Sequence, residues 1–422
     1  MSKTPLARAV ALATLGASLT LPSLAQADFI GDSKATLELR NFYMNRDLRD
    51  TTAAQQSKRE EWAQGFILKA ESGFTEGTVG FGLDAYAGLG LKLDSSDERA
   101  GTNLLPNSFG DEGPDEYSEA TATLKVKASK TLAKIGGLMP KLPTVAANDS
   151  RLLPQTFLGG HINSQEIDGL TLDAGQLREL NQRDSTDFQD LSLNAGAKRN
   201  FKLTGKGNQG DDFNFAGLSY KPTDNLTGAY HYGELEQLYK QHIFNVVHVL
   251  PIADKQSFKT DLRYARSTDD GSSNVDNKAF GALFTYALGF HSFGLGYQKM
   301  SGDTGFAYIN GTDPFLVNYV QISDFANKDE KSWQARYDFN FASIGIPGLT
   351  FMTRYLTGDN VELGANRSEG KEWERDTELM YVFQEGALKN LGVRWRNAAV
   401  RSNFANDIDE NRLIVSYTLP LL

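Results

Sequence analysis

The stretch Val79–Leu93, VGFGLDAYAGLGLKL, decides the fold. Its odd-numbered residues are all apolar, whereas its even-numbered residues are Gly, Asp, Tyr and Lys. Because successive side chains of a β-strand point to opposite faces, this alternation predicts a strand with one apolar and one polar face. The strand is longer than most strands of soluble proteins. Its polar face holds Asp84 and Lys92, so the two faces cannot both lie in apolar cores.

The same alternation recurs along the rest of the chain. Apolar faces hold Leu, Val and Phe with aromatic residues near the strand ends, and polar faces repeatedly hold Arg or Lys. Alternating segments cover 120–129, 280–286, 333–341, 349–355, 393–396 and 412–419. Short connections alternate with long polar ones, which are expected at 94–116, 267–278, 301–314 and 358–376. This order is typical of an up-and-down antiparallel meander.

The composition excludes several other classes of protein. The chain has 422 residues, 25 Phe, 16 Tyr, 40 Gly and no Cys, with a formal net charge of -10. Disordered chains are poor in aromatic residues, and a chain without cysteine has neither a disulfide scaffold nor a thiol nucleophile. The negative charge argues against a nucleic-acid partner. No apolar run is long enough for a multi-spanning helical protein, and no linker divides the chain.

The first 27 residues have the pattern of a secretory signal peptide. Lys3 and Arg8 precede the short apolar stretch 9–21, and Ala25-Gln26-Ala27 is a small-residue cleavage site. The apolar stretch is too short for the alternative of an anchor helix. We therefore expect residues 1–27 to be removed and residues 28–422 to form one domain.

An exported meander with an apolar face predicts a transmembrane antiparallel β-barrel in the bacterial outer membrane. A closed barrel pairs every backbone group within the lipid and leaves no sheet edge. The chain length suggests about 16 to 20 strands, which leave an aqueous lumen. The alternatives are a secreted multi-sandwich or a β-helix, because alternation alone is also found in sandwiches.

Seven stretches, which follow one another along residues 28–422, resemble the OprD family, the substrate-specific outer-membrane carboxylate channels of pseudomonads. They are DSKATLELRNFY (32–43), QGF (64–66), ESGF (71–74), RLLPQT (151–156), EKSWQARYD (330–338), PGLTFM (347–352) and RLIV (412–415). The resemblance implies eighteen strands, a constriction made by inward-folded loops, and a ladder of basic residues that passes carboxylates.

The candidate ladder consists of arginines on polar strand faces and around the first loop. Arginine is a permanently charged, planar donor that suits carboxylate, and a row of weak sites permits entry and exit. The alternative is an internal salt-bridge network with Asp84, Asp338 or Glu378. The ladder candidates are Arg46, Arg49, Arg59, Arg336, Arg354, Arg394, Arg396 and Arg412.

Three further site residues rest on the resemblance. Arg151, in the proline-containing segment 140–155, occupies the constriction arginine position of the third loop. Asp324 matches a carboxylate of an acidic patch opposite the basic residues, and Asp313 lies near a second such position. The patch would hold the amino end of a zwitterion. The alternative for all three is a solvated loop residue.

The predicted function is passive, substrate-selective uptake of small carboxylate solutes, either aromatic and cyclic acids or amino acids. The alternatives are a general diffusion porin, a purely structural barrel, and a barrel-embedded hydrolase that would use Ser219 and His231. No cofactor or metal is expected, since the five histidines lack metal-ligand spacing. The expected partners are carboxylate solutes, outer-membrane lipid and lipopolysaccharide, without nucleic acid, for a monomer or weak trimer.

Overall fold

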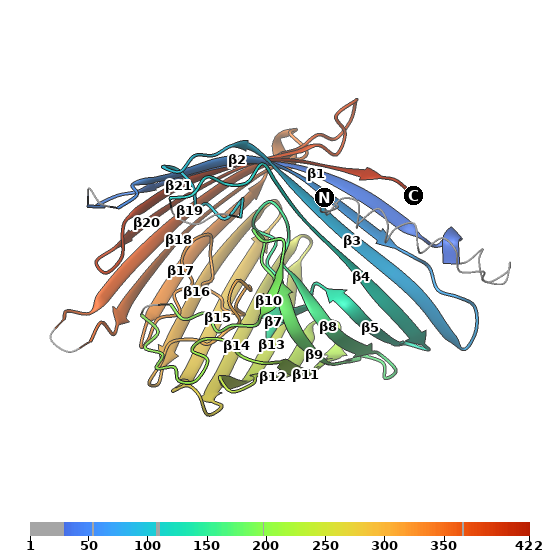
Figure 1. Cartoon of the computed structure of the whole chain (residues 1–422), viewed down its shortest axis with the longest axis horizontal. Coiled ribbons are helices and arrows are strands. Elements are labelled where there is room, and N and C mark those ends of the chain that lie inside the picture. Colours follow the sequence, from blue (N-terminus) through green and yellow to red (C-terminus); the bar gives the residue numbers. More distant parts are fainter. Residues whose placement is uncertain (1–28, 53–54, 107–109, 197, 365–366) are drawn as a thin grey trace, which may run out of the picture.

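The computed structural model describes residues 29–422 except 53–54, 107–109, 197 and 365–366. The predicted signal peptide, residues 1–27, lies outside these residues. Eighteen antiparallel strands form a closed barrel, as predicted (Figure 1). No helix in the described part of the chain is long and apolar enough to span a membrane.

The barrel strands are β1 (Lys34–Leu48), β2 (Lys58–Glu71), β3 (Val79–Asp94), β4 (Glu116–Ala128), β5 (Thr131–Leu138), β8 (Thr156–Ser164), β9 (Leu170–Asn181), β11 (Phe213–Thr223), β12 (Leu226–Leu235), β13 (Tyr239–Ala253), β14 (Gln256–Asp269), β15 (Asp276–Leu288), β16 (His291–Ser301), β17 (Lys331–Asn340), β18 (Leu349–Val361), β19 (Gly370–Val382), β20 (Gly392–Ser402) and β21 (Ile408–Pro420). The shorter elements are β6 (Lys141–Leu142), β7 (Val145–Ala146), β10 (Phe188–Asp190) and the 3₁₀ helix η2 (Phe341–Ile344).

The barrel closes where the first and last strands pair. β1 pairs with β2 on one side and with β21 on the other, and the register of the second pairing runs from Thr36 opposite Pro420 to Leu48 opposite Ile408. The C-terminus therefore lies beside the start of β1 (Figure 1). Closure satisfies the ladder hydrogen bonds of both strands, which a sheet edge in lipid could not do.

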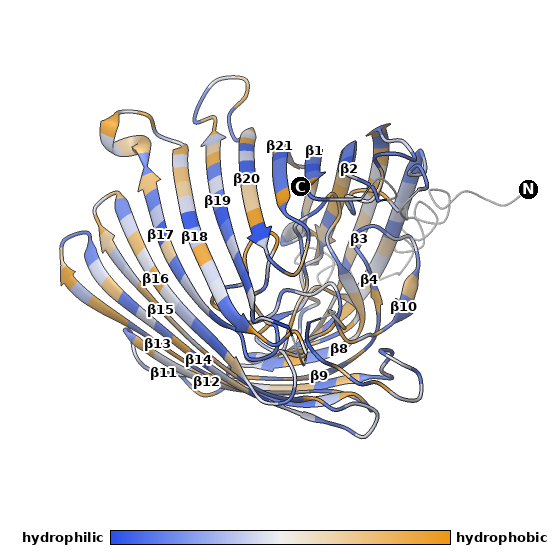
Figure 2. Ribbon diagram, turned by 90° about the vertical axis from the view of Figure 1, so that its left-hand side faces the viewer, coloured by the Kyte–Doolittle hydropathy of each residue, from blue (hydrophilic) through white to orange (hydrophobic). Residues whose placement is uncertain are grey.

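The two faces of the wall have the predicted chemistry. On β3, Val79, Phe81 and Leu83 are exposed on the outer face, while Gly80 and Gly82 on the other face are buried. Hydropathy alternates along most strands in the same way (Figure 2). On the later strands, Trp333, Trp395 and Leu413 are exposed outside, whereas Arg336, Arg396 and Arg412 alternate with them and face the lumen. The apolar band is the surface that lipid covers.

Short turns lie at the end of the barrel that holds the chain ends, and long loops lie at the other end. Two connections differ from the predicted limits. The seventh loop runs from residue 302 to 330 rather than to 314, and the eighth covers only 362–369 because β18 and β19 extend further. The seventh loop is rich in apolar residues without alternation, and these residues pack inside the barrel.

Loop 3 (139–155), loop 4 (182–212) and loop 7 (302–330) fold into the lumen, and Leu104 and Leu105 of loop 2 (95–115) are buried against Leu152 and Leu153 of loop 3. Val145 of loop 3, Leu193 of loop 4 and Ile309 of loop 7 are buried in one apolar cluster with wall residues such as Phe213. Part of the interior is therefore a packed core rather than open lumen.

Small wall residues leave room for loop 3. A Cβ atom at Gly65 of β2 would lie 3.2 Å from Leu152, and one at Gly88 of β3 would lie 3.1 Å from Leu153. Both leucines are almost fully buried. Larger residues at these lumen-facing positions would push loop 3 away from the wall.

Candidate functional site

The tip of loop 3 is held across the lumen by loops 4 and 7. Asn148 donates its side-chain amide to the Asp313 carboxylate, and the backbone N–H of Asp313 donates to the carbonyl oxygen of Ala146 at 3.0 Å. From loop 4, Arg183 Nη1 donates to Asn148 Oδ1 and to Ser150 Oγ, each at 2.8 Å. Three loops therefore converge on a constriction whose shape depends on Asn148.

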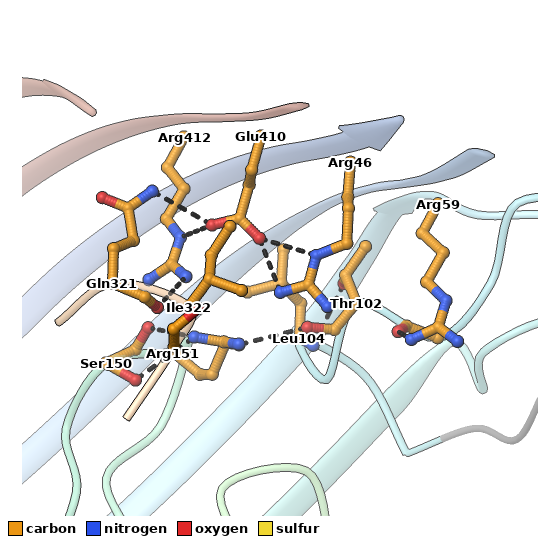
Figure 3. Close-up of polar contacts among 12 residues, drawn as sticks. Arg46, Arg59, Thr102, Leu104, Ser150, Arg151, Gln321, Ile322, Glu410 and Arg412 are labelled. Atoms are coloured by element: carbon orange, nitrogen blue, oxygen red, sulfur yellow. Dashed lines mark hydrogen bonds and ion pairs between the residues drawn. The ribbon is translucent and has the colours of Figure 1, made fainter. Parts of the chain in front are cut away.

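Arg151 is a cation of this constriction. Its Nε donates to the carbonyl oxygen of Thr102 at 3.1 Å, and its Nη1 donates to that of Ser150 at 3.0 Å. Among the described residues no carboxylate forms an ion pair with it. Burial, Arg412 and Arg183 lower the pKa of Arg151, which shows that cations crowd here (Figure 3).

One carboxylate serves two of the predicted ladder arginines. Glu410 on β21 lies 2.6 Å from Arg46 Nη2 and 2.6 Å from Arg412 Nε, and it is fully buried. Gln321 of loop 7 donates its side-chain amide to the same carboxylate at 3.1 Å (Figure 3). Arg46 and Arg412 therefore help to anchor loop 7 as well as charging the lumen.

The other two ladder candidates near the first loop, Arg49 and Arg59, lie toward the long-loop end. Arg59 Nη1 donates to the carbonyl oxygen of Gly101 at 3.1 Å. Arg49 is half exposed and forms ion pairs with Asp409 and, at 3.7 Å, with Asp47. Arg49 is therefore not among the residues that contact Glu410, which are Arg46, Gln321 and Arg412.

The strand arginines differ in how firmly they are paired. Arg336 binds both oxygens of Asp338, at 2.8 and 2.7 Å, and Arg354 lies 2.7 Å from Asp376. Arg396 and Arg394 share a single carboxylate, which is that of Glu378. The distances are 3.1 Å for Arg396 and 3.8 Å for Arg394, whose side chain is 40% exposed. Of these four strand arginines, Arg394 has the longest ion-pair distance and is therefore the most available to a solute.

Two adjoining recesses contain these arginines. The small arginine recess, about 310 Å³, is lined by Arg40, Arg151, Arg394 and Arg396 together with Glu38 and Asp149. The large arginine recess, about 490 Å³, is lined by Arg336, Arg354 and Arg396 together with Asp338 and Glu378, and it reaches the turn at Gly289. Arg396 lines both recesses, so their charged residues form one continuous surface of six guanidinium groups and four carboxylates. We call this surface the arginine wall.

A third recess, about 510 Å³, lies against β2–β5 and β8. We call it the lysine recess. Its charged lining is balanced, with three lysines and three carboxylates: Lys69, Lys134, Lys141, Glu71, Asp84 and Asp149. Asp84 lies 3.6 Å from Lys134 and 2.6 Å from Lys125, so this predicted partner pairs with lysines and not with the ladder arginines.

Asp313 and Asp324, the two predicted acidic-patch residues, have different partners. Asp313 faces loop 3, and burial raises its pKa above the usual aspartate range. Asp324 forms an ion pair with Arg199 of loop 4 and accepts the Tyr308 hydroxyl at 2.9 Å. The Asp324 charge is therefore compensated inside the loops, and the acidic patch stays a prediction.

Sequence reasoning missed Arg40, Arg183 and Arg199. Arg40 on β1 lies 2.7 Å from Asp149, and it donates to the carbonyl oxygen of Arg151 at 2.8 Å. Arg40 is six residues from Arg46, so the parity of the strand was a signal that could have found it. Arg183 and Arg199 lie in a long irregular loop, where no periodicity indicates which residues face the lumen.

The residues of the hydrolase alternative are not arranged for catalysis. His231 faces the lumen, where its ring lies beside Gly217. The strand register pairs His231 with Gly217, while Ser219 pairs with Ala229. In the described ranges no Ser219–His231 hydrogen bond and no metal-binding group of His, Cys, Asp or Glu is present.

A closed barrel with an apolar outer face, a charged lumen and inward-folded loops is the architecture of an outer-membrane channel. The family described as "outer membrane porin, OprD family" matches residues 27–421, and the chain belongs to this family.

Relatives and solved structures support the same family assignment. The chain is 40% identical over 416 residues to the porin-like protein GalP of Pseudomonas putida, covering 97% of each chain. It resembles the crystal structure of Pseudomonas aeruginosa OpdQ with a TM-score of 0.87 and 64% identity, covering 94% of this chain and all of that one. OccK9 (OpdG) of P. aeruginosa gives a TM-score of 0.88 and 44% identity, covering 93% and 100%. The chain is therefore an outer-membrane porin and not an enzyme.

Proposed function

We propose that this porin selects small carboxylate solutes and passes them along the arginine wall. The observation that carries the proposal is the pair of recesses joined at Arg396, which contain six guanidinium groups and four carboxylates. The excess of positive charge lowers the energy of an anion in the lumen, and a water-filled site screens it only in part.

The proposed contacts follow the pairing distances. Among the strand arginines that line the two recesses, Arg394 has the longest ion-pair distance, so we expect it to be a main contact for the solute carboxylate. Arg396, whose only described ion-pair partner is the carboxylate that it shares with Arg394, is the second contact. The parallel N–H donors of a guanidinium group match the two oxygens of a carboxylate. Because Glu378 competes for the same donors, a bound solute can leave again, which conduction requires.

The lining of the small arginine recess favours an aromatic or cyclic acid over a hydrophilic one. Phe42, Met380 and Ile414 line it beside the arginines. A ring can contact these side chains while its carboxylate contacts Arg394. The volume of about 310 Å³ suits a small solute and not a large one.

The alternative is a general diffusion porin, and single-channel recording separates the two. We expect benzoate at the short-turn side to interrupt the chloride current in a concentration-dependent way. Benzyl alcohol, which has the same ring without the charge, should not interrupt it. Equal effects of the two solutes, or none from either, would favour the general porin.

A further inference from the structure

The lipid-facing side of β14–β17, four neighbouring strands in Figure 1, carries a row of aromatic rings near the long-loop end. Each strand contributes one ring: Tyr264, Phe280, Tyr297 and Trp333. The ring centroids of Tyr297 and Trp333 are 4.5 Å apart, and those of Phe280 and Tyr297 are 6.5 Å apart. Such a row marks the boundary between hydrocarbon and headgroups.

A cation follows two residues beyond each ring, on the long-loop side and on the same outer face. These cations are Arg266, Lys278, Lys299 and Lys331. The register places Arg266 opposite Lys278 and Lys299 opposite Lys331. We call Lys278, Lys299 and Lys331 the cationic rim. Since each lies just beyond an aromatic ring, the rim lies at headgroup height.

Within the described residues the cationic rim is compensated only at its edge, where Asp359 lies opposite Lys331. Arg266 forms an ion pair with Asp276, but none of the three rim lysines forms an ion pair among the described residues. Like charges directly opposite each other on neighbouring strands are destabilising, and Lys299 faces Lys331. Asp359 on β18, opposite Lys331, marks the end of the patch.

The opposite side of the barrel differs. The outer-face residues at the long-loop ends of β1–β4 include Asp47, Glu60, Asp94 and Glu116. Outer-face cations at the long-loop ends of other strands are paired with carboxylates, as are Lys58, Lys240, Lys371 and Arg401, whereas the three lysines of the cationic rim form no ion pair among the described residues.

We propose that the cationic rim binds the phosphate groups of an anionic, phosphorylated lipid of the outer leaflet, while the aromatic row contacts its apolar part. The positive charge of the lysines suits a phosphate group. Their position just beyond the aromatic row places that phosphate at the depth of the lipid headgroups. Three lysines on adjacent strands suit a headgroup with two phosphates. The inference does not depend on which solute the lumen carries.

The test compares lipid retention by two matched triple variants of the full-length barrel. Lys278→Gln, Lys299→Gln and Lys331→Gln remove the rim. Lys130→Gln, Lys221→Gln and Lys255→Gln remove three exposed lysines from the short-turn end. Native mass spectrometry with added bisphosphorylated lipid A should show binding at least about tenfold weaker in the rim variant only. Equal retention by both variants would overturn the proposal.

A second measurement separates lipid binding from folding and from free phosphate. Without lipid A, Lys299→Gln should melt at the same or a higher temperature than the unaltered protein, because the like-charge pair of Lys299 and Lys331 is removed. With lipid A, the unaltered protein should gain more stability than the variant. Equal stabilisation by inorganic phosphate or dephosphorylated lipid A would overturn the proposal. A change of oligomeric state without a change in lipid retention would also overturn it and assign this face to contact between copies.

Discussion

The arginine wall and the lysine recess lie on different sides of the same lumen, and loop 3 reaches both, since Asp149 lines the lysine recess and the small arginine recess. Both are wet and charged. Among the residues that line them, the lysine recess has three lysines and three carboxylates, whereas the arginine wall has six arginines and four carboxylates; Asp149 belongs to both sets, and Asp376, the partner of Arg354, lies behind the lining.

The difference shows that the number of charges does not identify the solute path. What distinguishes the arginine wall is the shared carboxylate of Glu378, which leaves Arg394 weakly paired. Arginine also adds planar, permanently charged donors, whereas lysine is a flexible point charge. We therefore expect charge changes on the two sides to have unequal effects on carboxylate flux.

The largest effect concerns which residues of the barrel strands face lipid and which face the lumen. On β21, Val415 faces lipid and Ser416 lines the small arginine recess. Val415→Arg should cost about 2–4 kcal/mol of folding free energy near the bilayer midplane, because it places a charge in lipid. Ser416→Arg should cost much less and should change the conductance. Refolding into bilayers measures both, and equal destabilisation would contradict the orientation.

The next effect tests the two sides directly. Replacing Arg394 and Arg396 by Glu changes the charge of the arginine wall by four units. Even 1.4 kcal/mol on a transit barrier is tenfold in rate, so carboxylate flux should fall at least about tenfold. The effect should shrink at high salt, because screening acts in a wet lumen.

The matched control is Lys69→Glu with Lys134→Glu, which makes the same charge change in the lysine recess. Flux under a benzoate gradient should fall much less than in the arginine variant. If both variants lose flux equally, the lumen responds only to its total charge and the comparison between the two sides fails.

A smaller effect should follow from releasing loop 3. Arg40 binds Asp149 and donates to backbone carbonyl oxygens of Arg151 and, at 3.4 Å, Leu152. Arg40→Leu removes these contacts, so we expect a larger and noisier open-channel current with a weaker carboxylate preference. The change in flux should stay below tenfold, since Arg394 and Arg396 are intact. A quiet current of unchanged size would show that loop 3 does not need Arg40.

The smallest effect concerns pH. Burial raises the pKa of Asp313 above its ordinary 3.8, so this loop carboxyl takes up a proton before exposed carboxyls do as the pH falls. The protonated form is favoured in the fold, so stability from this group rises as pH falls through the raised pKa. Loss of its negative charge near Arg183 should increase anion preference in mild acid. In Asp313→Asn the reversal potential should show less of this pH dependence; an unchanged profile would assign it to other groups.

Much of the barrel could be predicted because strand alternation is local. The register of β20 places Trp395 toward lipid and Arg394 toward the lumen, as the sequence alone indicates. The alternative of internal salt bridges also describes part of the site, since Arg336 binds Asp338 with both donors.

The constriction could not be predicted in the same way. Arg199 reaches Asp324 only because loops 4 and 7, more than a hundred residues apart, pack together inside the barrel, and Arg183 reaches Asn148 and Ser150 only because loop 4 folds onto loop 3. The seventh loop has no periodic pattern that indicates which residues face inward. The sequence therefore predicts that it ends at residue 314, whereas in the structure it ends at residue 330.

Benzoate residence time in a single channel tests the central claim most directly, with Arg394→Gln compared against Lys134→Gln. The Arg394 variant loses an exposed guanidinium that is only weakly paired with Glu378, so benzoate should leave it several-fold faster than it leaves the unaltered channel. The Lys134 variant should keep the original residence time. An unchanged residence time in a correctly folded Arg394→Gln channel, or equal shortening in both variants, would contradict a carboxylate path along the arginine wall.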